Sequence, residues 1–495
     1  MKLGIIGGGG AAVALLAALT RDRVPDIDIT VFEPAKNSGP GRAYLADSDA
    51  ALLNVPAERM SVLPDATGHF VQWIKDQGGL DPTLALSISP EAFLPRRLFG
   101  EYLTDVVANI ANRLAEHGKS FRTVGSAVIR LFQGPAGFHA LTADNQRFYD
   151  LDRVVLCVGT GGPVDVFRLS GALGYVNDPY PMWTRLAAVP AGASVLVLGT
   201  GLTAVDAVLF LLENGHRGRI SMASRNGLLP TVRTSAAAPA LRHLSREAVL
   251  AALAANPVMT SHRLLTLLDS ELREVGMDRN RACAEADPGE PFARRLRRQL
   301  QQGRHGGALW QPIIIEAMHE SVELIWHAMP DGERRRFLTH WHRKFVSLLS
   351  PMPQRTAARL QTAADAGQLR VIRGLDSVWR GEATRPAFLA STDAGDIAAD
   401  VVINTVRPAA AAIPEAATSL VHGLVGTGMA RLHHLGGLDV APDSNRILSA
   451  GGKESRCLFA LGHLTAGTHY YTSSMLIISR QARVVADQIL GDNSV

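Results

Sequence analysis

The stretch Leu3-Gly4-Ile5-Ile6-Gly7-Gly8-Gly9-Gly10-Ala11-Ala12 joins an apolar run directly to a glycine tract. An alanine-rich apolar segment continues to Leu19, and a second apolar run, 27–32, ends on the acid Glu33. This order predicts a strand, a tight turn, a helix and a second strand. The three small-residue positions of the G-x-G-x-x-G/A dinucleotide fingerprint are filled by Gly7, Gly9 and Ala12.

Each position in this fingerprint has its own physical role. Gly7 permits the sharp turn, Gly9 lets a pyrophosphate approach the backbone, and Ala12 lets the helix pack closely on the strand. The start of the helix offers free N–H groups and a positive dipole to phosphate. Glu33 stands where a carboxylate can accept both hydroxyls of an unphosphorylated ribose. The first unit of the chain is therefore predicted to bind FAD.

A second nucleotide-binding unit is predicted further along the chain. An apolar run, 194–198, leads into Gly199-Thr200-Gly201-Leu202-Thr203 and an apolar helix to Leu212. The next strand, 219–223, ends in Ser224-Arg225 where an acid normally stands. An acid there would repel a 2′-phosphate, whereas an arginine offers it a planar fork of donors. The residues predicted to bind NADPH are Gly199, Gly201, Thr203 and Arg225.

Length and composition indicate a globular protein of several domains. With 495 residues, of which 47% are hydrophobic and 19% charged, the chain is long enough for two to four domains of roughly 150 residues. No run of about 18 uncharged apolar residues occurs, so no membrane partner is expected. The glycine tract breaks residues 1–20 where the apolar core of a signal peptide would be continuous.

Charge and cysteine content exclude other classes of site. The net charge is +4, and the densest basic cluster, Arg294-Arg295-Leu296-Arg297-Arg298, has the spacing of a solvated helix face. No nucleic-acid partner is expected. Cys157, Cys283 and Cys457 lie far apart and form no redox or metal motif. The histidines of 305–342 have no ligand spacing, so no metal is predicted, and a cytoplasmic location is expected.

The remainder of the chain continues this α/β pattern. Helices are expected at 69–74 and from Pro95 to about Glu116, before a β region at 121–148. Its hairpin turns are expected at Gly134-Pro135 and Asp144-Asn145. A buried strand, 152–158, follows and ends at Gly159.

The second half of the chain is predicted to begin with helices and to return to strands. The periodicity of residues 236–345 predicts helices, which interrupt the second nucleotide fold. The helices are expected at 244–253, 264–272, 312–328 and 333–345. A strand at 400–405 and a strand with a glycine loop at 458–467 follow, and a last helix spans 473–490.

The sequence therefore predicts an α/β protein with two Rossmann-like dinucleotide-binding domains and a helical insertion. The first part of the FAD-binding domain is assigned to 1–165 and its C-terminal part to 400–495. The NADPH-binding domain is assigned to 190–235 and 346–400, with the insertion at 236–345.

The two fingerprints and the strand ending in Gly159-Thr160-Gly161 resemble the FAD/NAD(P)-binding two-dinucleotide flavoproteins. Within these, the chain is similar to the class B and N-hydroxylating flavin monooxygenases. The segments 53–60 and 95–103 and the stretch Ser224–Pro230 resemble a bacterial subgroup described as FAD/NAD(P)-binding proteins. The resemblance covers nearly the whole chain and is most specific for the cofactors.

The resemblance implies an NADPH- and O₂-dependent monooxygenase that hydroxylates a small amine or amino acid through a flavin C4a-hydroperoxide. Further cofactor-binding candidates are Arg42, Asn54, Met60, Arg96, Tyr102, Gly159, Gly462 and Gly467. Catalytic candidates near the flavin ring are His463, His469 and Tyr470. Two alternatives stay open: an NADPH-dependent reductase or dehydrogenase without oxygen insertion, and a flavin-binding partner protein without enzymatic activity. A homo-oligomer is also left open.

Overall fold

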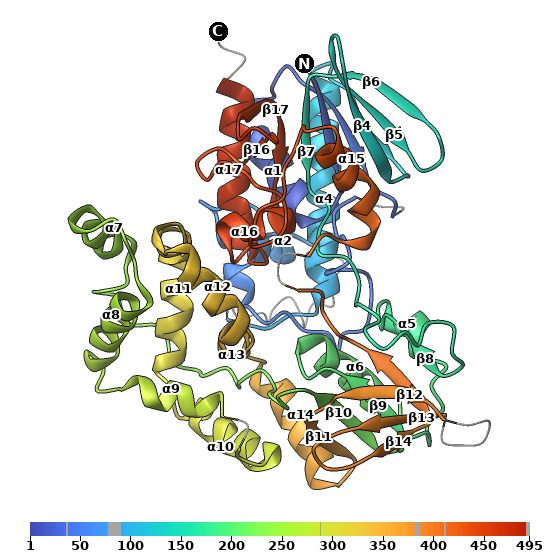
Figure 1. The fold of residues 1–495 in the computed structure, drawn as a ribbon, viewed down its shortest axis with the longest axis vertical. Helices are drawn as coiled ribbons and strands as arrows, with labels where there is room; N and C mark the ends of the chain where they lie inside the picture. The colour runs from blue at the N-terminus through green and yellow to red at the C-terminus, as the bar shows by residue number, and fades with distance from the viewer. Residues whose placement is uncertain (36–37, 78–90, 288, 382–386, 410–411, 492–495) are drawn as a thin grey trace. The chain divides into compact units, whose positions relative to one another are not determined.

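The chain folds into two compact units (Figure 1). The structure is a computed structural model that describes all residues except 36–37, 78–90, 288, 382–386, 410–411 and 492–495. Unit 1 comprises residues 1–46, 55–162 and 408–495, and unit 2 comprises 47–54 and 163–407. None of the described helices combines the length and the apolar character needed to cross a lipid bilayer.

Unit 1 is organised around a six-stranded sheet. Its strands are β1 (Lys2–Ile6), β2 (Asp28–Phe32), β3 (Phe121–Val124), β7 (Arg153–Leu156), β16 (Arg446–Leu448) and β17 (Glu454–Ala460). They lie in the order β16-β17-β7-β1-β2-β3, and all neighbours are parallel except β16 and β17. Helix α1 (Gly10–Leu19) contacts both α4 (Arg96–Glu116) and α17 (Met475–Gly491). The predicted strand–turn–helix–strand unit is confirmed, and its first strand lies inside the sheet.

A small antiparallel sheet completes the strands of unit 1. It consists of β4 (Val128–Gly134), β5 (Gly137–Thr142) and β6 (Arg147–Leu151). The two predicted hairpin turns are confirmed, and Asn145 adopts a positive φ of 62° in the second. Helix α15 (Thr418–Gly426) packs on β4. The expected β region is thus divided, because β3 pairs with the parallel sheet instead of with the hairpins.

Unit 2 contains a five-stranded parallel sheet. Its strands are β8 (Tyr175–Val176), β9 (Val195–Leu198), β10 (Ile220–Ser224), β11 (Leu369–Arg373) and β15 (Val401–Asn404). They lie in the order β11-β10-β9-β15-β8, and helices α6 (Leu202–Glu213) and α14 (Gln354–Asp365) contact each other beside it. A separate antiparallel sheet is formed by β12 (Ser377–Arg380), β13 (Phe388–Ser391) and β14 (Ile397–Ala399).

The boundaries between the units differ from those expected. The sequence predicts that 400–495 belongs to the FAD-binding part, but β15 pairs with β9 and β8, so this part of unit 1 begins at Pro408. The segment 47–54 also belongs to unit 2, where Ala50 and Ala51 are buried in its apolar core. Both differences arise from pairing and packing between residues distant in sequence.

The helical insertion interrupts unit 2 between β10 and β11, as predicted. Its helices are α7 (Arg246–Ala255), α8 (Ser261–Arg273), α9 (Arg279–Glu285), α10 (Phe292–Arg304), α11 (Trp310–Ala328), α12 (Asp331–His340) and α13 (His342–Leu349). The single helix expected at 333–345 is wrong, because the chain breaks at Trp341 into α12 and α13. The solvated arginine face expected at 294–298 is also wrong in part, because Arg295 is buried.

The remaining elements in the described part of the chain are short. They are the 3₁₀ helices Ala57–Arg59, Glu415–Ala417 and Gly462–Thr465, and the helices α2 (His69–Asp76), α5 (Met182–Arg185) and α16 (Ala466–His469). The helix expected from Pro95 begins one residue later, with Pro95 as its N-cap.

Candidate nucleotide-binding sites

The first glycine turn fits tightly between neighbouring strands. Gly7 has a φ of 99°, and its N–H donates to the Phe32 carbonyl at 2.8 Å. A Cβ at Gly7 would lie 2.2 Å from the Cys157 carbonyl oxygen. Gly7 is therefore required by the backbone geometry of the sheet itself. Ala12 is buried in α1, in agreement with the close helix packing expected for it.

Glu33 contacts the backbone of this turn through its carboxylate. Its Oε2 accepts from the Gly8 N–H at 2.7 Å, and its Oε1 accepts from the Ala35 N–H at 2.9 Å. A Cβ at Gly8 would lie 2.8 Å from the Glu33 Cβ, which explains a glycine at a position the fingerprint leaves open. The carboxylate is thereby held beside the glycine turn, where a ribose with two free hydroxyls can reach it.

A second loop approaches the same turn. The Gly39 N–H donates to the Gly8 carbonyl at 2.7 Å, and a Cβ at Gly9 would lie 3.5 Å from the Gly41 Cα. Arg42 follows in this loop and is half-buried. The loop brings the predicted Arg42 into the neighbourhood of Gly9, although Gly41 lies far from the fingerprint in sequence.

The other predicted flavin-side residues have different surroundings. Met60 is buried, and Arg96 lies close enough to Tyr44 to oppose the effect of burial, which raises the pKa of Tyr44 to about 12. Tyr102 is fully buried among the aromatic rings of α2 and α4, with its hydroxyl 2.8 Å from His69 Nδ1. Asn54 belongs to unit 2, where its carbonyl accepts from Arg233 at 2.7 Å. Asn54 is therefore assigned to a different unit from Met60, Arg96 and Tyr102.

The C-terminal loop lies against the start of α1. A Cβ at Gly462, whose φ is 76°, would lie 3.6 Å from the Ala11 Cβ. His463 Nε2 is 2.9 Å from the Ala412 carbonyl. A Cβ at Gly467 would lie 2.3 Å from the Gly436 carbonyl, so this glycine is needed for packing. His463 thus follows a residue that packs directly beside the first glycine turn.

His469 and Tyr470 form the most constrained part of this loop. Both are buried, and Tyr470 has a φ of 63°, which is rare for an aromatic residue. Burial raises the pKa of the Tyr470 phenol well above its usual value, and the Tyr471 hydroxyl adds to the effect. Strain of this kind is common at functional sites. Gly159, three residues after β7, is exposed and has a φ of 70°.

The second glycine turn shares the backbone design of the first. Gly199 has a φ of 115°, and a Cβ there would lie 2.6 Å from Thr405 Oγ1. Gly201 is exposed, and a Cβ there would have no atom within 4 Å. Thr200 is buried and donates through Oγ1 to the Leu228 carbonyl at 2.6 Å. Thr203 lies half-buried in the first turn of α6.

Arg225 stands at the end of β10 and is exposed. The Arg225 carbonyl accepts from the Gly374 N–H at 3.1 Å, so the ends of β10 and β11 are joined at this point. Arg373, the last residue of β11, pairs in register with Ser224. Its Nε donates to Asp393 at 3.0 Å, in a pair whose side chains are both more than half exposed. Such a surface pair is weak and can exchange for another anion.

Gly8, Gly41, Thr200 and Arg373 lie beside the predicted residues but are not among those predicted from the sequence. Gly8 and Thr200 lie within the fingerprints and could have been included by their position. Gly41 and Arg373 could not, because only the fold brings them beside residues far away in the chain.

Both turns are suited to a phosphate group. The N-caps of α1 and α6 are Gly9 and Gly201, and neither helix receives a side-chain cap. The first N–H groups of each helix are therefore left for another acceptor. The carboxylate beside the first turn and the guanidinium beyond the second suit different ribose groups.

Comparison with known proteins agrees with this geometry. Residues 4–161 match the family model described as FAD-NAD(P)-binding, so this part of the chain is an FAD-NAD(P)-binding domain. The uncharacterised protein YdhS of Escherichia coli K12 is 20% identical over 451 residues, which cover 81% of this chain and 82% of that protein.

Two solved structures share the fold over the whole chain. L-lysine 6-monooxygenase from Pseudomonas syringae has a TM-score of 0.61 at 16% identity, covering 100% of this chain and 99% of that one. Ornithine N-hydroxylase from Kutzneria sp. 744, described with reduced FAD, NADP⁺ and L-ornithine, has a TM-score of 0.58 at 14% identity with the same coverage. The predicted two-dinucleotide flavoprotein fold is confirmed.

Proposed function

We propose that the chain is an FAD-dependent, NADPH-using monooxygenase that N-hydroxylates a small amine or amino acid. The observation that carries the proposal is the contrast between two similar glycine turns with opposite charges after the second strand. Glu33 follows the first turn and Arg225 follows the second. The pair of turns accounts for two different dinucleotides on one chain.

The FAD assignment rests on unit 1. The N-terminus of α1 would face the diphosphate, and Glu33 would accept from the ribose hydroxyls of the adenosine half. Arg42, in the loop beside Gly9, would add a positive charge. The buried His469 and Tyr470 and the half-buried His463 are the groups proposed to hold or move protons near the flavin ring.

The NADPH assignment rests on unit 2. Gly201 leaves open space at the start of α6, so a diphosphate can approach the backbone. Arg225 and Arg373, at the ends of adjacent parallel strands, would both donate to the 2′-phosphate. Asp393 now pairs with Arg373 and would be exchanged for the phosphate.

The monooxygenase assignment rests on the shared fold of the lysine and ornithine hydroxylases. Reduced flavin supplies the oxygen-transfer chemistry in such enzymes, and the protein positions the substrate and excludes water. A disulfide reductase is disfavoured because the three cysteines are free and separated in sequence. Burial also raises the pKa of the Cys157 thiol, which makes a thiolate there unfavourable.

Rapid-mixing absorbance of the purified protein tests the proposal. The protein should carry bound flavin, NADPH should reduce it without oxygen, and oxygenated buffer should then produce a transient near-ultraviolet absorbance before reoxidation. L-Lysine, L-ornithine and small diamines are then added in turn, and one of them should hasten the decay of the transient and yield a hydroxylamine. Gly332 lies in α12, where an added Cβ would have no atom within 4 Å, and Gly332→Ala is the matched control that should behave as wild type.

Three results would contradict parts of the proposal separately. Direct reoxidation with every amine, accompanied only by hydrogen peroxide, would favour the reductase alternative. Bound flavin that NADPH does not reduce would favour a non-enzymatic flavin protein. A chain that purifies without flavin and does not take it up would contradict the assignment from Gly7 onward.

A further inference from the structure

Helix α10 covers the segment that leads away from Arg225. Leu296 and Leu300 of the helix belong to the same buried apolar cluster as Leu229 and Val232, and Phe292 packs against that cluster. The helix therefore rests on the chain immediately after the arginine proposed to hold the 2′-phosphate.

Arg295 is the buried cation in this contact. The residue is only 5% exposed. Its Nη1 donates to the Asp287 carbonyl at 2.7 Å, and its Nη2 donates to the Gly227 carbonyl over a long 3.5 Å. Burial lowers the pKa of Arg295, against the attraction of Glu290 and Glu285. A buried guanidinium needs such partners, and here one of them lies two residues from Arg225.

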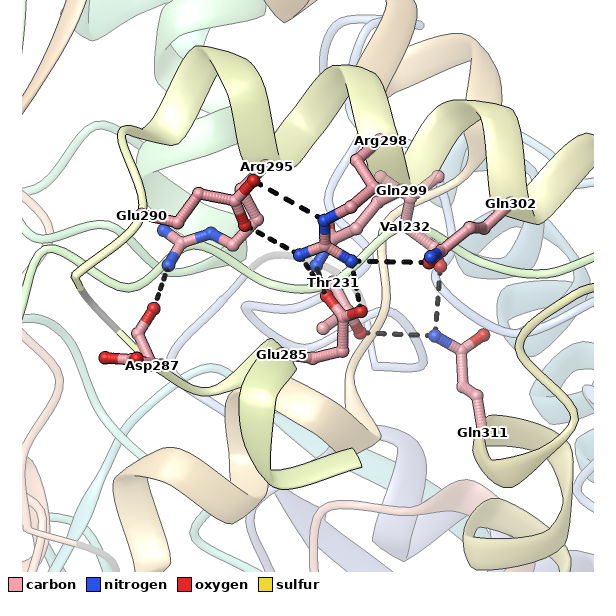
Figure 2. A network of polar contacts seen from close by, with 10 residues as sticks. All are labelled: Thr231, Val232, Glu285, Asp287, Glu290, Arg295, Arg298, Gln299, Gln302 and Gln311. Carbon is pink, nitrogen blue, oxygen red and sulfur yellow. Dashed lines mark hydrogen bonds and ion pairs between the residues drawn. The ribbon is translucent and has the colours of Figure 1, made fainter. Parts of the chain in front are cut away.

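A polar network fixes the helix that carries Arg295. Figure 2 shows the Arg298 guanidinium between two carboxylates, Glu285 at 2.5 Å and Glu290 at 2.7 Å. Glu285 is buried and also accepts from Gln299 at 2.7 Å. These bonds join α9, the loop after it and α10, and they restrict rotation of α10 about its own axis.

The segment beneath α10 is held along its length. Gln311 donates to the Val232 carbonyl at 2.9 Å and accepts from the Thr234 N–H at 2.9 Å (Figure 2 shows the first of these). The Ser235 N–H donates to the Gly303 carbonyl at 3.0 Å. These bonds hold the chain after Gly227. We therefore expect loss of the Arg295 contact to alter the backbone mainly between Gly227 and the end of β10.

The same loop is also bonded to the glycine turn. The Gly227 N–H donates to Ser224 Oγ at 3.0 Å, and Thr200 Oγ1 donates to the Leu228 carbonyl at 2.6 Å. Gly227 itself has a φ of 62°. Arg225 and Asn226 are both exposed and form a short turn. After this turn, Arg295 donates to the Gly227 carbonyl and Thr200 donates to the Leu228 carbonyl.

We propose that Arg295 is a positioning residue for NADPH recognition, because it holds the Gly227 carbonyl and so fixes the turn on which Arg225 stands. The helical insertion then contributes to cofactor selectivity without contacting the cofactor. This inference rests on the proposed NADPH site of unit 2.

The test compares three variants of the full-length flavoprotein. Arg295→Met removes the donors and keeps an aliphatic stem, whereas Arg295→Lys keeps the charge but loses the planar fork. Arg297→Met is the matched control on the same helix, since Arg297 pairs with Asp365 at the surface. The dissociation constants of NADPH and NADH, the FAD content and the melting temperature are measured for each.

Arg295→Met is expected to weaken NADPH binding by about two- to tenfold, the range for losing one ordinary hydrogen bond. NADH binding should change by less than about twofold on the same scale, and the FAD content should be unchanged. Arg295→Lys should show most of the same loss even if Arg295→Met does not fold. Arg297→Met should match wild type.

Other outcomes overturn the inference. An equal loss of NADPH and NADH affinity would indicate a merely structural role. Full rescue by lysine would indicate a long-range charge effect instead of positioning. If wild type binds NADPH no better than NADH, the proposed cofactor assignment fails and this inference fails with it. If wild type prefers NADPH to NADH and all three variants keep this preference, only the proposed role of Arg295 is overturned.

Discussion

The two glycine turns of the chain share a backbone design and differ in what surrounds it. In both, the first glycine has a positive φ, and in both a glycine is the N-cap of the following helix. After the second strand, Glu33 stands in one unit and Ser224-Arg225 in the other. The comparison distinguishes the glycines, which permit the backbone conformation of the turn, from the charged residues, which are proposed to determine ligand selectivity.

The turns also differ in how crowded they are. Gly9 lies beside Gly41 of a second loop, whereas a Cβ at Gly201 would have no atom within 4 Å. At the first glycine the obstacle to a side chain is the backbone carbonyl of Cys157 for Gly7, but only the Thr405 hydroxyl for Gly199. The first turn is therefore the less adaptable of the two.

The largest effect is expected from Gly7→Ala. Strain at positive φ and overpacking against a sheet carbonyl together cost about 2–6 kcal/mol of unfolding free energy. Gly199→Ala should cost less, about half as much, because the Thr405 hydroxyl can rotate away at the cost of its bond to the Leu198 carbonyl, whereas the Cys157 backbone is held by its bond to Ile6. Urea denaturation, read together with the flavin content, measures both. Equal costs for the two variants would contradict this account of the crowding.

Gly201→Ala provides the control for that experiment. The position has a negative φ of −81° and open surroundings, so its unfolding free energy should fall by no more than about 1 kcal/mol. NADPH binding should still weaken, because a methyl group would occupy the path of the diphosphate. A large loss of stability would show that Gly201 belongs with the residues that make the turn.

A smaller effect, confined to ligand selectivity, is expected from Arg225→Ala. NADPH affinity should fall by roughly 10- to 100-fold, the range for losing charge-assisted hydrogen bonds to a phosphate, while NADH affinity stays nearly constant. Titration of the flavoprotein with both nucleotides measures the two dissociation constants.

Arg373→Ala sharpens the same comparison across the strands. If both arginines hold the 2′-phosphate, this variant should repeat the selectivity loss to a lesser extent, because Arg373 must first leave Asp393. Equal losses of NADPH and NADH affinity in either variant would contradict the 2′-phosphate assignment.

Local pattern was sufficient for the turns and for most of the elements. The alternation of apolar runs with glycine turns predicted β1, α1, β2, β9, α6 and β10, because each depends on residues adjacent in sequence. Glu33 could be assigned for the same reason, since it follows β2 directly.

The remaining features depend on contacts between distant residues. Arg295 has the neighbours of a solvated helix face in sequence, yet packing on Gly227 buries it. Arg373 reaches the strand edge only because β11 pairs with β10 across the helical insertion. β15 was assigned to the wrong unit because an apolar run does not identify its partner strand. The C-terminal loop could be assigned to the first turn, but its strained Tyr470 has no signature in the sequence.

The smallest expected effect is on the pH dependence of stability, and it arises after α6, the helix that follows the second glycine turn. Thr20 is the C-cap of α1 and donates through its hydroxyl to the Leu16 carbonyl, whereas α6 is followed by the buried His216. Burial lowers the pKa of His216, and backbone groups of Ala193 and Pro190 only partly oppose it. The unfolded chain therefore binds a proton that the folded chain resists, so this contribution to stability is lost as the pH falls below about 6.5.

His216→Gln should reduce the difference in melting temperature between pH 7.5 and pH 5.5, because it removes the proton uptake that favours the unfolded chain. The histidines common to both proteins, including His69 and His342, cancel in the comparison. Wild type, measured at both pH values, is the reference for this comparison. An unchanged pH dependence in His216→Gln would show that the burial of His216 does not contribute to the acid sensitivity of the protein.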